Sequence, residues 1–217
     1  MSYNYLKESL QDYIGQLSAK SPCPGGGSAS ILSLALANAL ILMVCNFSVE
    51  CKRIAKVSQK VSREILNKAS EIQPVLNKCI EEDSAIYKAI QDAMKNLKNN
   101  PQQYKENLIK SINLHMEMLK YCKKMLEWNF QLVEHANPYL ISDIGVSASL
   151  IEGAAKATKV NILVNLCEIK DCKHNTNVLK ELEETSSTLI NEAQQVISMI
   201  ENKMLSKVIC EPEKEKS

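Results

Sequence analysis

The chain has 217 residues, with 26 Lys and Arg against 25 Asp and Glu, so its formal net charge is only +1. Without a basic excess it is poorly suited to general binding of a nucleic-acid backbone, which requires cations that neutralise phosphates. Only six Gly and six Pro occur, and a composition with few helix breakers predicts an all-α protein whose length fits one domain.

The cysteine and histidine residues predict neither a disulfide framework nor a metal site. Eight cysteines are present, but they form no C-x-x-C pair, and we see no secretory signal ahead of them. We therefore expect free thiols and a cytoplasmic protein. The three histidines form no H-E-x-x-H motif or Cys/His cluster, so we expect no metal site.

The first predicted helix covers residues 3–17 and has one apolar face. That face consists of Leu6, Leu10, Tyr13, Ile14 and Leu17. A loop over residues 21–27 ends this helix.

The loop places Pro24 and three consecutive glycines, Gly25, Gly26 and Gly27, directly before Ser28. Glycines are costly in backbone entropy, so they are kept where the chain turns tightly or where something approaches the backbone closely. Ser28 is expected to cap the next helix, whose first N–H groups have no partner within the helix. Two interpretations stay open: an ordinary N-cap after a loop, or a seat for an anion or a flat polar ligand on the exposed amides.

Residues 28–49 carry no charge and are numerous enough to cross a bilayer. Several Ser and Asn side chains interrupt this run, and no basic cluster precedes it, unlike a signal or an anchor. We therefore predict the buried central helix of a bundle, and no membrane insertion. This helix either ends near Val49 or continues past Glu50, where the pattern becomes charged and amphipathic. Pro74 predicts a kink or a restart.

An acidic residue interrupts the apolar stripe of this amphipathic segment. The stripe is spaced by four and three residues and consists of Ile65, Ala69, Ile72, Leu76, Cys79, Asp83, Ile86 and Ile90. A carboxylate in such a place has a raised pKa unless a partner compensates, and it serves a structural hydrogen bond or an active site. The alternative is that the register slips and Asp83 belongs to a solvated Glu-Glu-Asp run.

After a break at residues 99–101, a helix is predicted over 103–134, with a second polar interruption at His115. Its stripe is Leu108, Ile112, His115, Leu119, Cys122, Leu126, Asn129 and Val133. A lone histidine on an apolar face is more often a core residue than a catalyst, so we favour a structural role for His115.

A loop over 135–141 contains Asn137, and Ser142 is expected to cap a helix that reaches residue 169. Asp143 would complement the dipole of that helix. Asn161 and Asn165 stand four residues apart and share a face, where two amides could hold the edge of a heterocycle or bond a neighbouring backbone.

A connection over 170–175, a final amphipathic helix over 176–208 and a charged tail over 211–217 complete the chain. Together these elements predict one domain over residues 1–210, a bundle of long antiparallel helices.

Four segments, taken in order, resemble the cyclodeaminase/cyclohydrolase family, which comprises the C-terminal domain of formiminotransferase-cyclodeaminase and stand-alone methenyltetrahydrofolate cyclohydrolases. Residues 21–28 resemble the P-G-G-G-S segment of that family, and residues 81–87 its D-x-D-x-x-x-F segment. Residues 137–146 are similar to the G-N-x4-S-D-x2-V segment, with Ala136 in place of its glycine, and residues 161–166 to N-V-x-I-N-L. Glu50 and Cys51 depart from the family, which usually has a glycine and a further basic residue there.

The resemblance implies an all-helical homodimer that acts on a reduced folate and needs no cofactor. It implies that Asp83 is the catalytic carboxylate and that Lys52, with Arg53, meets the glutamate tail. The implied contacts to the folate are Gly25, Gly26, Gly27, Ser28, Asn137, Asp143, Asn161 and Asn165.

Two activities follow from the resemblance, and they stay open here. One is hydrolysis of 5,10-methenyltetrahydrofolate to 10-formyltetrahydrofolate, which a stand-alone domain favours by analogy. The other is cyclodeamination of formiminotetrahydrofolate with release of ammonia. The alternatives are a folate-binding or scaffold homologue that has lost turnover, and a helical interaction module or membrane-associated bundle.

Overall fold

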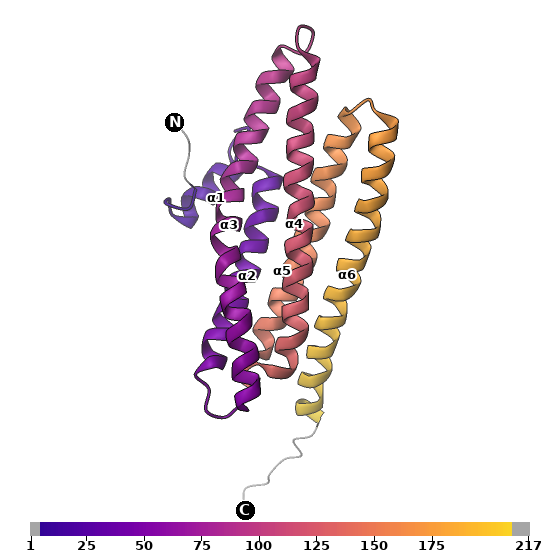
Figure 1. Ribbon diagram of the computed structural model, residues 1–217. Coiled ribbons are helices and arrows are strands. Elements are labelled where there is room, and N and C mark those ends of the chain that lie inside the picture. The colour runs from indigo at the N-terminus through magenta and orange to yellow at the C-terminus, as the bar shows by residue number, and fades with distance from the viewer. Residues whose placement is uncertain (1–4, 210–217) are drawn as a thin grey trace, which may run out of the picture.

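The structure, a computed structural model, describes residues 5–209, and this range holds helices and no strand. The helices are α1 (Leu10–Ser18), α2 (Gly26–Val49), α3 (Lys56–Lys95), α4 (Pro101–His135), the short 3-10 helix η1 (Pro138–Leu140), α5 (Ile141–Glu168) and α6 (Cys172–Ile209). The long helices run antiparallel and pack around one core (Figure 1). The predicted all-α bundle is confirmed. The predicted tail over 211–217 lies outside the described residues.

Helix α2 lies at the centre of the bundle, where it packs against both α3 and α5. Its small side chains Ala35 and Ala37 are buried, which lets these neighbours approach closely. In the described part of the chain, α2 is the one helix long and apolar enough to cross a membrane, and 56% of that stretch is buried inside the bundle. Such burial is what the core helix of a bundle shows.

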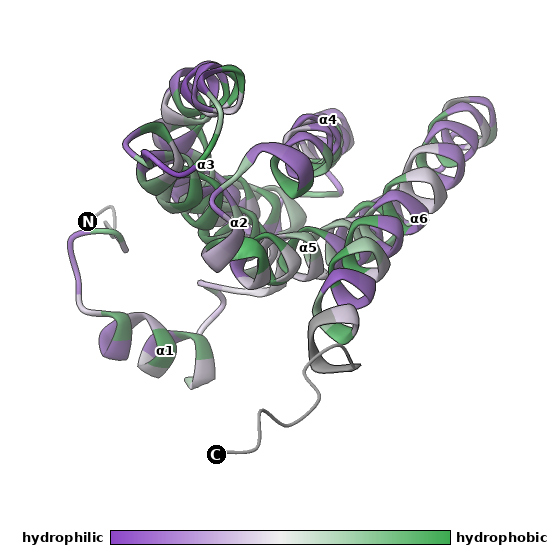
Figure 2. Cartoon of the chain, turned by 90° about the horizontal axis from the view of Figure 1, so that it is seen from below, coloured by the Kyte–Doolittle hydropathy of each residue, from purple (hydrophilic) through white to green (hydrophobic). Residues whose placement is uncertain are grey.

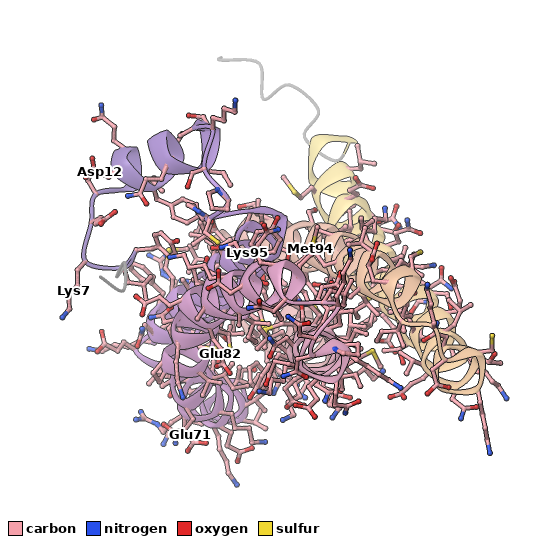
Figure 3. All side chains as sticks on the ribbon, turned by 90° about the horizontal axis from the view of Figure 1, so that it is seen from above. Lys7, Asp12, Glu71, Glu82, Met94 and Lys95 are labelled. Carbon is pink, nitrogen blue, oxygen red and sulfur yellow. The ribbon has the colours of Figure 1, made fainter. Side chains whose placement is uncertain are left out.

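The first helix is shorter than the sequence predicts and is held away from the bundle. It begins at Leu10 because Ser9 and Asp12 form a capping box, and residues 5–9 are not helical. Of its predicted apolar face only Tyr13 is buried, whereas Leu10 is 68% and Ile14 is 56% exposed. Figure 2 shows α1 standing apart from the other helices. Side chains near this end, such as Lys7 and Asp12, project outward (Figure 3).

The boundaries of the later helices settle several open points. α2 ends at Val49, and α3 begins at Lys56 as a separate helix. α3 continues through Pro74 without a restart, because the carbonyl that loses its donor belongs to the exposed residue Ser70.

Ser142 does not cap α5: the N-cap residue is Leu140, the last residue of η1.

Both predicted stripes face the core. Apart from Ile86, which is partly buried, every member of the α3 stripe is buried, and so is every member of the α4 stripe. Asp83 is therefore a core-facing residue and does not belong to a solvated acidic run. His115 lies on the facing side of α4. Asp83 and His115, one polar residue from each stripe, meet in the interior, where both line a pocket.

Candidate functional site

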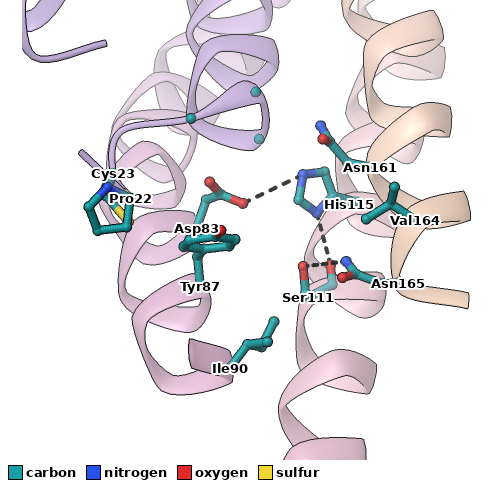
Figure 4. Close-up of a pocket in the computed structure, with 13 residues that line it drawn as sticks. Pro22, Cys23, Asp83, Tyr87, Ile90, Ser111, His115, Asn161, Val164 and Asn165 are labelled. Atoms are coloured by element: carbon teal, nitrogen blue, oxygen red, sulfur yellow. Dashed lines mark hydrogen bonds and ion pairs between the residues drawn. The ribbon is translucent and has the colours of Figure 1, made fainter. Parts of the chain in front are cut away.

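A pocket of about 220 Å³ opens at the N-terminal end of α2, and four helices supply its walls. Six of the residues predicted from the sequence line it: Gly25, Gly26, Gly27, Asp83, Asn161 and Asn165. Tyr87, Ser111 and His115, which were not predicted as site residues, line it as well (Figure 4). Helix periodicity alone gives no sign of this grouping, because α3, α4 and α5 contribute from segments far apart in the sequence; the family resemblance implied part of it.

The glycine segment is the first turn of α2. Gly25 is the N-cap residue, and no side chain caps the helix, so the predicted capping role of Ser28 is wrong. Ser28 is fully buried, its hydroxyl pairs with the Tyr13 hydroxyl at 3.1 Å, and it does not line the pocket. Its backbone N–H instead donates to the Asp83 carboxylate. The Asp83 carboxylate of α3 thus accepts a hydrogen bond from a backbone amide that has no partner within α2, at the positive end of that helix.

Gly27 is required by this arrangement. A Cβ at Gly27 would come within 2.6 Å of Cγ and Oδ2 of Asp83, which is closer than real Cβ atoms come to a neighbour. No residue with a side chain fits there while the carboxylate keeps its place. Gly25 has open space around its Cβ position, so no neighbouring side chain covers its backbone where it lines the pocket.

Asp83 is only 9% exposed, and this burial raises the pKa of its carboxyl group. The charge of a protonated His115 and the hydrogen bond from the Ser28 N–H act in the opposite direction but do not outweigh the burial. A carboxyl group in this state holds a proton to a higher pH than an exposed aspartate. It can therefore both stabilise a cation and accept or return a proton.

His115 lies beside Asp83, with its Nε2 atom 3.6 Å from Asp83 Oδ1. Its other ring nitrogen, Nδ1, is 2.9 Å from the carbonyl oxygen of Ser111, one turn earlier in α4. The side chain is 1% exposed. The sequence favoured a purely structural role because its stripe gave no hint of a partner. The partner is the equivalent interruption of the α3 stripe, and pairing the two interruptions would have been the available signal.

The two predicted asparagines of α5 face the pocket from the opposite wall, as Figure 4 shows. Asn165 donates from Nδ2 to Ser111 Oγ at 2.9 Å, and Asn161 donates to Ser30 Oγ at 3.4 Å. These bonds fix the orientation of both amides. They place hydrogen-bonding groups across the cavity from the carboxylate.

Three further predicted contacts lie at the other end of α2. Lys52 follows the C-terminal end of that helix. The backbone N–H of Asn137 donates to Ser48 Oγ at 2.9 Å, and Asp143 lies in the first turn of α5. The 24 residues of α2 span about 36 Å at 1.5 Å per residue. A single copy of the chain therefore does not bring Lys52, Asn137 or Asp143 to the pocket of Asp83.

No group of three His, Cys, Asp or Glu side chains that could hold a metal ion is found among the described residues. The pocket instead offers one buried carboxylate, one imidazole, two amides and a bare helix end. This set suits the binding of a polar, positively charged planar ligand and the transfer of protons to and from it.

Comparison with known proteins shows that the chain is similar to folate-related proteins. The family model described as formiminotransferase-cyclodeaminase matches residues 9–184. A methenyltetrahydrofolate cyclohydrolase of Methylorubrum extorquens is 26% identical over 183 residues, which is 81% of this chain and 88% of that protein. The formimidoyltransferase-cyclodeaminase of Gallus gallus is 23% identical over 90% of this chain, which spans 36% of that longer protein.

A solved structure supports the same relationship. The crystal structure of formiminotetrahydrofolate cyclodeaminase from Thermotoga maritima superposes with a TM-score of 0.84 at 26% sequence identity. The superposition covers 92% of this chain and 99% of that one.

Proposed function

Because the chain belongs to the formiminotransferase-cyclodeaminase family, we propose that it is a folate one-carbon enzyme whose substrate binds in the pocket of Asp83. The reaction proposed first is hydrolysis of 5,10-methenyltetrahydrofolate to 10-formyltetrahydrofolate. The observation that carries the proposal is the buried Asp83 carboxylate at the open end of α2. The similar cyclohydrolase of Methylorubrum extorquens, most of whose length this chain covers, supports the reaction type.

The charge of the substrate explains why a buried carboxylate suits this reaction. The methenyl carbon belongs to an amidinium cation, and a carboxylate attracts such a cation more strongly in a site of low dielectric than it would in water. Water adds to that carbon, and the tetrahedral intermediate then opens to a formyl group. Both steps move a proton between oxygen and nitrogen, and Asp83, with its raised pKa, can accept and return it.

The remaining pocket residues would position the folate. The backbone of Gly25, Gly26 and Gly27 lets a flat ring lie against the start of α2. Asn161 and Asn165 would then bond the edge of the ring from α5. This chemistry needs only acid–base groups, so we propose that the enzyme works without a metal or a redox cofactor.

A homodimer is part of the proposal. Helices α2 and α5, which pack side by side, carry a stripe of apolar side chains on their outer face. The stripe includes Leu36, Phe47, Val146, Val160 and Val164, each at least 51% exposed. Helix α1 projects beyond the bundle on this side (Figure 2). A second copy seated on this face would cover the stripe, and that burial is the usual basis of a two-fold interface.

The dimer would also complete the site. The pocket holds about 220 Å³, less than the 300–1,000 Å³ of most small-molecule sites, so part of a folate would extend beyond it. If the two α2 helices run antiparallel across the two-fold axis, the far end of one lies near the glycine end of the other. Lys52, with Arg53, and the residues Asn137 and Asp143 of one copy would then face the folate held by Asp83 of its partner. We accordingly propose a cytoplasmic enzyme whose apolar face meets a second copy and not a membrane.

Cyclodeamination of formiminotetrahydrofolate is the second candidate activity, supported by the similar Thermotoga maritima structure. One assay separates the two. Loss of methenyltetrahydrofolate absorbance on addition of the protein indicates the cyclohydrolase, whereas gain of that absorbance together with ammonia from formiminotetrahydrofolate indicates the cyclodeaminase. Saturable folate binding with neither change would contradict both and indicate a binding homologue without turnover.

A further inference from the structure

We propose that His115 is the proton partner of Asp83, so that the pocket holds two exchangeable protons and not one. The inference rests on the proposed function and deepens it, because it assigns a role to a residue for which the sequence favoured only a packing role. The role follows from the hydrogen bonds and the position of the histidine ring.

The hydrogen bonds of the ring set where its proton lies. Nδ1 is 2.9 Å from the carbonyl oxygen of Ser111, and a carbonyl can only accept, so Nδ1 carries a hydrogen. In the neutral imidazole Nε2 is then bare. It faces Oδ1 of Asp83 at 3.6 Å and has no hydrogen-bond partner although it is buried. Most buried side-chain nitrogens in proteins are hydrogen-bonded, so an open Nε2 that faces a carboxylate is available for a proton.

The position of the pair suits proton exchange. Both residues line the same pocket, and Figure 4 shows the ring between the carboxylate and the Ser111 carbonyl. Hydrogen bonds that are long in a ligand-free site often shorten when the substrate binds. A closure of about half an ångström would bring Nε2 within hydrogen-bond distance of Asp83.

Among the described residues that line the pocket, Asp83 and His115 are the only ones whose side chains can carry a charge at neutral pH. The titratable side chains that face the pair are Tyr13, Cys23 and Tyr87. Burial raises the pKa of both Tyr13 and Cys23, so each stays neutral at neutral pH, and the Tyr87 hydroxyl accepts a hydrogen bond from Gln91. The wall from α5 presents the uncharged amides of Asn161 and Asn165.

Proton balance shows why two sites are useful. The attacking water loses both of its protons: one ends on the nitrogen released when the ring opens, and the other goes to solvent. Asp83 takes the first as the C–O bond forms and passes it to Nε2 of His115. The carboxylate is then free to take the second proton from the hydroxyl of the intermediate and give it to the leaving nitrogen as the C–N bond breaks. Imidazolium next to carboxylate finally releases its proton to solvent.

The first test uses the full-length protein and two variants that cannot titrate. His115→Asn can keep the bond to the Ser111 carbonyl, and His115→Gln places an amide near the position of Nε2. We expect kcat to fall at least tenfold in both and one limb of the pH profile of kcat to disappear, while KM changes less than threefold. Cys122→Ala, a buried change one heptad further along the same stripe, should leave the profile unchanged. A pH profile that keeps both limbs in the histidine variants would overturn the proposal.

The second test does not depend on turnover. In wild-type protein we expect the imidazole ¹⁵N resonances of His115 to change in two steps during a pH titration, because each member of a coupled pair senses both protonations. In Asp83→Asn only one step should remain. A single identical step in both proteins would show that no proton is shared, whether or not the histidine variants fold. If wild-type protein acts on neither folate, the proposed function fails, and this titration still decides the pairing.

Discussion

Gly27 and Asp83 are in direct contact across the interface of α2 and α3. The backbone of the glycine leaves room for the carboxylate and for nothing more, since a Cβ on Gly27 would come within 2.6 Å of all three carboxyl atoms. The N–H of the next residue, Ser28, donates to the same carboxylate. The triple-glycine segment therefore holds the proposed catalytic residue in place as well as lining the pocket.

The first prediction concerns this contact. Gly27→Ala should displace the Asp83 carboxylate, lower kcat about 10- to 100-fold and destabilise the fold by about 1–3 kcal/mol through overpacking. Turnover of methenyltetrahydrofolate and urea unfolding measure the two effects. Gly15→Ala, in the interior of α1 with open space at its Cβ position, should retain full activity. Full activity in Gly27→Ala would mean that the position of the carboxylate does not matter.

The second prediction separates the proposed catalytic role of Asp83 from its contribution to stability. Asp83→Asn should lower kcat about 10²- to 10⁴-fold, the usual range for loss of an acid–base group, while helicity stays at the wild-type level. Glu82→Gln changes the neighbouring, exposed acid and should retain activity. An active Asp83→Asn protein would remove Asp83 from the mechanism.

The third prediction is the pH dependence of stability. Burial raises the pKa of Asp83 in the folded protein, so the folded state keeps this proton to a higher pH than the unfolded chain, in which a carboxyl titrates near about 3.9. Between those two values the folded state binds more protons, and the contribution of Asp83 to the free energy of unfolding falls as pH rises. The Asp83→Asn variant has no titrating group at this position, so its free energy of unfolding does not fall for this reason as pH rises. Urea midpoints from pH 4 to 8 should therefore show the variant gaining stability relative to wild type as pH rises. A difference that is flat, or that has the opposite sign, contradicts a raised pKa.

The sequence predicts the fold well and the site in part, for physical reasons. The spacing of apolar residues predicts the helices and the burial of Asp83, because both depend on one local stripe. It misses the contact between His115 and Asp83, since that contact depends on two stripes meeting in space. It also misassigns Ser28, because the backbone N–H of Ser28 donates to a carboxylate 55 residues later in the chain. The capping box at Ser9, by contrast, could have been recognised from Ser9 and Asp12 alone.

The fourth prediction concerns the apolar face of α2 and α5. Leu36 is 51% exposed at the middle of this face, so Leu36→Glu should convert a dimer into a monomer in sedimentation equilibrium. Leu179→Glu, at an exposed position of α6, should remain a dimer. A wild-type protein that sediments as a monomer would contradict the proposed interface. Co-sedimentation with lipid vesicles would show that lipid covers the face instead.

The last prediction tests whether one site uses residues of both copies. Lys52→Glu/Arg53→Glu should weaken substrate binding, and Asp83→Asn should abolish turnover, so each protein alone is impaired. If the basic segment acts on the pocket of its partner, a mixed dimer contains one site with both defects and one intact site. Random mixing makes half of the dimers mixed, so activity should recover to about a quarter of wild type. If the basic segment served its own pocket, every site in a mixed dimer would keep one defect, and mixing would restore nothing. Unfolding and refolding the mixture allows exchange of subunits, and a mixture that is never unfolded is the control for slow exchange. Recovery only after exchange is the result expected from a shared site.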